Sequence, residues 1–141
     1  MVHIEAKFYT ATASHGRQRV TSSRPIKTTA MPRVLHITKL MALAIRLDDL
    51  LATGQVKDQA EIARTAGITR ARVTQILNLT QLAPDIQQAI LDLEPTTDST
   101  PRFREREVRA IAILPDWVKQ RKLWKRLKAT SKADRLELRR T

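Results

Sequence analysis

Polar side chains recur at helical spacing between residues 70 and 78, and their types can hydrogen-bond to the exposed edges of DNA bases. An arginine can donate two parallel hydrogen bonds to guanine, and a glutamine or asparagine can make the matching pair with adenine. Alanine and threonine methyl groups can contact thymine. On an ordinary surface helix such a row would only be solvated. The residues that we expect to contact bases are Arg70, Ala71, Thr74, Gln75 and Asn78.

A second group of residues is suited to contact phosphate. Thr69 and Arg72 border the base-contacting row, and Gln59 begins the preceding helix, where side-chain and backbone amides can reach phosphate oxygens. A basic run further along is interleaved with Trp117 and Trp124, which share one helix face and are expected to pack in the core. The run is denser than solubility requires, although a solvated face and a membrane-surface helix are alternatives. The expected phosphate contacts in this run are Lys119, Lys122, Lys125 and Arg126.

The base-contacting row needs a scaffold, and residues 58–79 match a helix-turn-helix pair. The small side chain of Ala63 permits a close helix crossing, and Gly67 suits the positive φ of the turn. Ile68 is predicted to fill the space beneath the turn. A plain antiparallel helix pair would explain the glycine but not the whole apolar set. The remaining apolar positions that seat the two helices are Ile62, Ala66, Val73, Ile76 and Leu77.

Helix-starting and helix-ending residues predict an all-α core of six helices. An apolar stripe between Pro32 and Gly54 predicts one long helix. Asp58, with Glu61 three residues later, predicts a capping box, and Thr69 is expected to cap the base-contacting helix. A fourth helix is expected to open at Ala83-Pro84 and to run through Leu93. A fifth is expected to end at Pro115, and the last to begin at Asp116.

The first 33 residues lack helical periodicity. Val2, Ile4, Ala6 and Phe8 alternate with polar residues, and Ser14-His15-Gly16 can turn the chain into residues 17–23. A short β-hairpin is therefore one interpretation. A flexible basic arm rich in Thr, Ser and Arg is the other, because an isolated hairpin is only marginally stable.

Charge divides the 141-residue chain, which has a net charge of +12. Residues 1–35 carry +5, residues 36–98 carry −2 and residues 99–141 carry +9. The excess suits a polyanionic partner, nucleic acid first, and phosphate attraction is expected mainly from the two basic ends. We expect a basic N-terminal arm or β-hairpin at 1–33, a helical DNA-binding domain at 34–130 and a basic C-terminal tail at 131–141.

Other classes of function find little support. The chain has no cysteine, its three histidines are scattered, and no metal site is expected. The longest apolar run, Leu40–Ile45, is too short to span a membrane. Adjacent acidic residues diverge on their helices, and no phosphate-binding loop or nucleophile motif appears. We expect no enzymatic activity and no cofactor, and we expect a cytoplasmic, nucleoid-associated protein.

The segment 58–93 resembles the central DNA-binding domain of the ParB/KorB family of partition and plasmid regulatory proteins. In that family the recognition helix is followed by a leucine-rich turn, a proline and a PxxIxxAI helix, and here the sequence reads VTQILNLTQLAPDIQQAI. The downstream RAIAILPDWVKQRKLWKRL looks like the family's next helix pair, so the likeness covers about residues 36–128. The family's nucleotide-binding and dimerisation domains are not matched, so we expect no CTPase or sliding clamp.

The resemblance implies a stand-alone, ParB-like protein of the kind found on phages and other mobile elements. Transcriptional regulation through double-stranded DNA is the first function that we expect. An accessory or architectural role in recombination or in plasmid or phage maintenance, with a recombinase or other mobile-element protein as partner, is the second. RNA binding is disfavoured because an A-form major groove excludes a helix. The apolar residues Leu35, Met41 and Leu50 exceed one packing face and would allow a weak homodimer.

Overall fold

The chain divides into two compact units, Met1–Met31 and Pro32–Thr141. In the first, β1 (Tyr9–Thr12) pairs antiparallel with β2 (Gln18–Thr21), with Tyr9 opposite Thr21. The alternating residues 2–8 and the turn expected at residues 14–16 lie outside the described residues. The computed structural model describes residues 9–12, 18–21, 31–97 and 102–138, with side chains from 31 to 97 and from 102 to 132.

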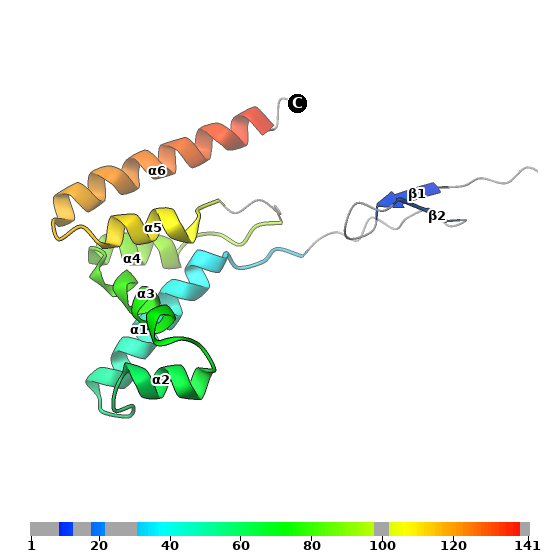
Figure 1. The fold of residues 1–141 in the computed structure, drawn as a ribbon. Coiled ribbons are helices and arrows are strands. Elements are labelled where there is room, and N and C mark those ends of the chain that lie inside the picture. The colour runs from blue at the N-terminus through cyan, green and yellow to red at the C-terminus, as the bar shows by residue number, and fades with distance from the viewer. Residues whose placement is uncertain (1–8, 13–17, 22–30, 98–101, 139–141) are drawn as a thin grey trace, which may run out of the picture. The chain divides into compact units, whose positions relative to one another are not determined.

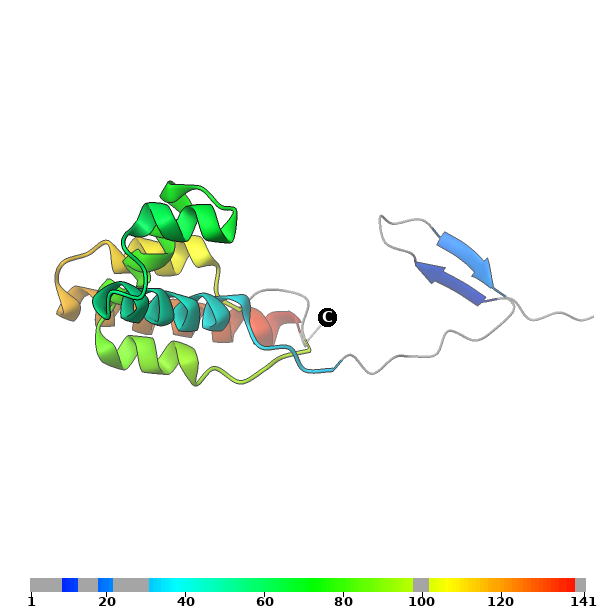
Figure 2. The same ribbon diagram turned by 90° about the horizontal axis from the view of Figure 1, so that it is seen from below.

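The second unit is mostly helical in its described part, which confirms the predicted all-α class. Figure 1 shows α2 at one end of this unit and α6 at the other, with α5 running beside α6. In Figure 2, α1 and α4 lie alongside each other. The helices are α1 (His36–Ala52), α2 (Gln59–Ala66), α3 (Arg70–Leu77), the 3-10 turn η1 (Asn78–Gln81), α4 (Pro84–Leu91), α5 (Glu105–Ala112) and α6 (Trp117–Leu138).

Two clusters of buried apolar side chains hold this unit together. The larger one joins α1, η1, α4, α5 and α6 around fully buried residues such as Met41, Ile86 and Ile90. Each large apolar side chain contributes roughly 1.5–3 kcal/mol when buried. The smaller cluster seats α2 and α3 against the C-terminal half of α1. It consists of Ile62, Ala63, Val73 and Leu77, with Leu47, Leu51 and Val56 packed against it.

Gln120 fixes α6 to the rest of the unit, and its side chain is fully buried. Its amide oxygen accepts a hydrogen bond from the Ala83 backbone N–H at 2.8 Å. Its amide nitrogen donates to the backbone carbonyls of Gln81, at 3.1 Å, and Leu114, at 2.7 Å. One side chain therefore joins α6 to the turn before α4 and to the end of α5. Sequence reasoning did not single out this residue.

Helix α1 begins later than predicted, and two residues of the apolar stripe that we expected at a dimer contact are buried in the core. Residues 32–35 are not helical, because the backbone N–H and carbonyl of Arg33 both bond to Thr96, at 2.8 and 3.0 Å. Leu35 and Met41, which we expected to remain for a dimer contact, are 7% and 0% exposed. The expectation of a dimer surface is wrong for these two residues, because the unit's own core buries both. Leu50, the third residue named for that contact, is half-buried.

The C-terminal part also differs from the prediction. The helical domain was expected to end at Thr130, with a tail from Ser131 onward. In the structure α6 continues to Leu138. The segment contains no proline or glycine that would end a helix, and the helix continues through it. The fourth helix, in contrast, ends at Leu91 rather than at Leu93.

Candidate nucleic-acid interface

Local side-chain hydrogen bonds cap the first turns of α2 and α3. The Asp58 carboxylate accepts from the Glu61 backbone N–H at 2.8 Å, and this bond lowers the pKa of Asp58. The Glu61 carboxylate accepts from the Lys57 N–H at 2.8 Å, one residue before the position expected for a capping box. The Thr69 hydroxyl accepts from the Arg72 N–H at 3.1 Å. Both predicted N-terminal caps are therefore present, and α3 starts at a defined residue.

The turn between the two helices closes around Gly67, whose φ is +65°. The Ile68 N–H bonds to the Ala63 carbonyl at 3.1 Å, which is the hydrogen bond of a Schellman C-cap. The prediction that Ile68 fills the space beneath the turn is wrong, because its side chain is 38% exposed. Ala66 is exposed as well. The residues of the turn therefore lie outside the small apolar cluster, whose last member in α2 is Ala63.

The face of α3 opposite its buried residues carries the polar row. Val73, Ile76 and Leu77 are buried, as predicted. Their burial holds the helix on the unit and leaves the other side open to a large ligand. The side chains of Arg70, Ala71, Thr74, Gln75 and Asn78 are all exposed. Asn78 lies at the start of η1, because α3 ends at Leu77 rather than near Leu79 as expected.

A hydrogen bond couples the start of α2 to the middle of α3. The Thr74 hydroxyl lies 2.9 Å from the amide oxygen of Gln59 and 3.2 Å from the Arg70 carbonyl. Its single proton can be donated to only one acceptor at a time. When it is donated to Gln59, the amide nitrogen of Gln59 keeps its own donors. Gln59 and Thr74 are therefore positioned next to each other, as contacts to one ligand require.

Arg72 has an intramolecular partner that the sequence did not indicate. Its guanidinium forms a forked pair with Glu105 on α5: Nη1 bonds to Oε1, and Nη2 to Oε2 at 3.1 Å. The bond to Glu105 raises the pKa of Arg72. This pairing occupies the planar donor fork of Arg72. The expected phosphate contact stays a prediction and would have to use the remaining guanidinium donors or displace Glu105. Arg72 braces α3 against α5.

Glu105 is the centre of a small ionic cluster. Its carboxylate also lies 3.7 Å from Arg109 Nε and 3.5 Å from His36 Nε2. Hydrogen bonding from Arg72 lowers the pKa of Glu105, more than partial burial raises it. One carboxylate therefore connects α3, α5 and the first residue of α1. Sequence reasoning missed this residue, because its main partner is distant in the chain and no local spacing marks the pair.

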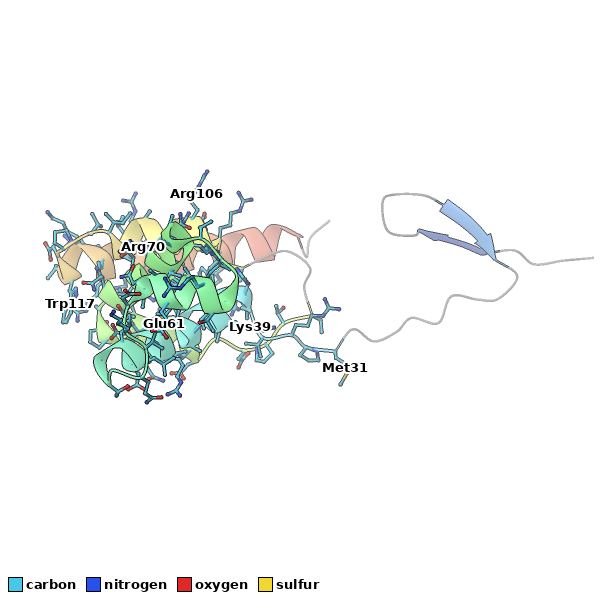
Figure 3. All side chains as sticks on the ribbon, turned by 60° about the horizontal axis from the view of Figure 1, so that its bottom comes forward. Met31, Lys39, Glu61, Arg70, Arg106 and Trp117 are labelled. Carbon is cyan, nitrogen blue, oxygen red and sulfur yellow. The ribbon has the colours of Figure 1, made fainter. Side chains whose placement is uncertain are left out.

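The Arg72–Glu105 pair also brings other arginines at the start of α5 close to α3. Arg104 and Arg106 flank Glu105, and both side chains are exposed. Neither forms an ion pair within the part of the chain that the structure describes. Figure 3 shows Arg70 and Arg106 on neighbouring helices, which the Arg72–Glu105 pair joins. Arg104 and Arg106 are candidate phosphate contacts that the sequence analysis did not name.

The basic residues of α6 lie elsewhere. Figure 1 shows α5 between α6 and the α2–α3 pair, so the α6 residues are separated from the expected base-contacting row. Arg121 forms a forked ion pair with Asp85 on α4, at 2.9–3.1 Å, and this bond lowers the pKa of Asp85. The four residues of α6 that we expected to contact phosphate, Lys119, Lys122, Lys125 and Arg126, are all exposed.

The two tryptophans of α6 have different surroundings, although their spacing places them on one face. Trp124 is 5% exposed, and its ring lies 5.1 Å from that of Phe103, centroid to centroid. Trp117 is 48% exposed. The prediction of core packing holds for Trp124 and is wrong for Trp117. Trp117 is the first residue of α6, next to the connection from α5, where the core no longer covers the helix.

Comparisons with models of protein families, with curated proteins and with solved structures found no match to this chain. None of the helices that the structure describes is long and apolar enough to cross a membrane. Within the described residues, no group of at least three His, Asp or Glu side chains is arranged to hold a metal ion.

Proposed function

We propose that the protein binds double-stranded DNA in a sequence-specific manner and acts as a transcriptional regulator, with α3 in the major groove. The observation that supports this most is the exposed row of Arg70, Ala71, Thr74 and Gln75 on α3, whose other face is buried; Asn78, the first residue of η1, extends the row. The sequence resemblance to ParB/KorB helix-turn-helix domains points to the same use. A protein of this kind would be associated with the nucleoid.

Each part of the row has a specific chemical use. The guanidinium of Arg70 suits guanine O6 and N7, and the amides of Gln75 and Asn78 suit adenine. The methyl groups of Ala71 and Thr74 suit thymine. Because the Arg72 side chain is paired with Glu105, the row has one arginine for guanine. A short site with one guanine contact and neighbouring A·T pairs is the recognition pattern that these side chains favour.

Phosphate contacts would position the helix in the groove. Gln59 and Thr69 lie at the N-terminal ends of α2 and α3, where backbone N–H groups favour anions. Arg104 and Arg106 would contact the backbone on the α5 side. The basic residues of the first 33 positions would add attraction that does not depend on sequence.

An accessory role in recombination or in plasmid or phage maintenance is the second candidate. The observation that favours it is the exposed apolar surface at the start of α6, which is typical of a protein-binding site. A regulator needs only its operator, whereas an accessory factor must also bind another protein. A recombinase or another mobile-element protein would be such a partner.

The test begins with selection of binding sites from random duplex DNA, using the purified protein. We expect one enriched motif, and we expect Arg70→Ala and Gln75→Ala each to cost about 1–3 kcal/mol on it. Arg70→Lys keeps the charge but loses the fork, so it should keep affinity for random DNA and lose the guanine preference. Gln88→Ala, on an exposed glutamine of α4, is the matched control. If Arg70→Ala and Gln75→Ala bind the motif like the wild type, α3 does not read DNA.

A further inference from the structure

The outer face of α6 carries an open groove with a volume of about 730 Å³. Leu114, Leu123 and Ala129 contribute apolar side chains to it. The other lining residues are long basic side chains, which present their aliphatic stems to the groove and their charges to its rim. These residues are Lys119, Lys122, Lys125 and Arg126.

Exposed apolar side chains are also present in the segment that leads from α5 into α6. Ile113 is 71% exposed, Trp117 48% and Val118 62%, and Leu123 in the groove is 38% exposed. Single exposed apolar residues are ordinary, but a group of them in one short segment marks an interaction surface. We call the groove, together with this segment that leads into α6, the α6 surface.

The charge of the α6 surface restricts what can cover it. Residues 117–132 contain no aspartate or glutamate. A second copy of the same surface would therefore bring lysine against lysine, and like charges at an interface oppose association. DNA phosphates would satisfy the ammonium and guanidinium groups, but they offer nothing to Leu114 or Leu123. The ligand that suits both features is apolar along one side and acidic along its edges.

We propose that the α6 surface binds an amphipathic helix of another protein, with an apolar stripe flanked by aspartate or glutamate. The stripe would lie against Leu114 and Leu123, in the helix-in-groove manner. The flanking carboxylates would pair with Lys119, Lys122 and Arg126 and would accelerate association. This inference does not depend on DNA binding by α3, because it uses a different surface of the unit.

The test uses fluorescent helical peptides and the purified full chain, with binding measured by anisotropy. One designed peptide has leucines in a single stripe with flanking glutamates, a second has the same composition in scrambled order, and a third has lysine in place of glutamate. We expect the first to bind at micromolar concentration and the other two at least about tenfold more weakly, since both the stripe and its charge are needed. Equal binding of the first two peptides, or no binding of the first at millimolar concentration, would overturn the proposal.

Variants locate the binding and separate it from the alternatives. Leu123→Asp and the charge reversal Lys122→Glu should each weaken the first peptide at least about tenfold, whereas Lys39→Glu on α1 is a matched control that should not. Circular dichroism checks that Leu123→Asp is folded. If Lys122→Glu weakens random duplex DNA but not the peptide, the surface contacts phosphate instead. If light scattering shows a dimer that Leu123→Asp dissociates, the α6 surface binds a second copy of the chain, and the proposal is overturned.

Discussion

Replacing Arg72 with alanine tests the brace between α3 and α5. The Arg72 side chain is 32% exposed and that of Glu105 20%, so the pair lies between a surface and a buried ion pair. Exposed pairs contribute about 0–1 kcal/mol, and breaking a buried pair costs about 3–5 kcal/mol. We therefore expect Arg72→Ala to lower the free energy of unfolding by about 2 kcal/mol at pH 7, measured by urea denaturation.

Removing the other partner should cost more. In Arg72→Ala, the Glu105 carboxylate keeps Arg109 and His36 nearby, at 3.7 and 3.5 Å. In Glu105→Gln, Arg72 and Arg109 lose their shared carboxylate and face each other as like charges. A double-mutant cycle should give a coupling of at least about 1 kcal/mol. A coupling below about 0.5 kcal/mol would refute the brace. Equal losses in the two single variants would contradict the additional role of Glu105 towards Arg109.

The pH dependence provides an independent check of the same cluster. The pKa of Glu105 is lowered in the folded protein from its usual value of 4.5. Its stabilising contribution is therefore complete above about pH 4.5 and is lost as the pH falls through the lower, folded value. Wild type should lose stability in this acidic range more steeply than Glu105→Gln. Parallel pH profiles for the two proteins would contradict the assignment.

Three further predictions follow from other contacts. Gln120→Leu should lower the free energy of unfolding by about 3 kcal/mol, because it leaves the buried Ala83 N–H unpaired, and Gln88→Leu should change it by less than about 0.5 kcal/mol in the same urea assay. Gly67→Ala should cost about 1 kcal/mol, from its positive φ alone, since a Cβ there would meet nothing within 4 Å; an unchanged midpoint would contradict this. The double variant Arg104→Ala/Arg106→Ala should flatten the log–log salt slope of DNA binding by about 0.9 per lost contact, and an unchanged slope would remove both from the interface.

The sequence predicted those features that depend on neighbouring residues. Asp58 and Thr69 cap their helices and Gly67 takes a positive φ, because each of these signals acts within a few residues. The helical class and the buried face of α3 follow from apolar periodicity. The exact start of α1 did not, because it depends on the pairing of Arg33 with Thr96, which is far away in the sequence.

Contacts between distant segments account for what the sequence could not predict in the candidate site. Arg72 has the same residue type and nearly the same position as Arg70, and no pattern in the chain says which of them meets a carboxylate. The partner, Glu105, is 33 residues away. Periodicity likewise predicts the same burial for Trp117 and Trp124. The core covers Trp124 but not Trp117, which lies next to the end of α5.

Because Arg72 is paired with Glu105, different residues would supply nonspecific DNA affinity and base preference. With that charge neutralised, the block of residues 36–98, which has a net charge of −2, offers few free cations to phosphate. In the proposed DNA complex, nonspecific attraction would then come from basic residues outside the block, such as those before residue 36 and those around α5. Base preference would depend on Arg70, Gln75 and Asn78, whose hydrogen bonds do not release counterions. We therefore expect added salt to weaken binding to all DNA while changing the ratio between the selected motif and random DNA much less.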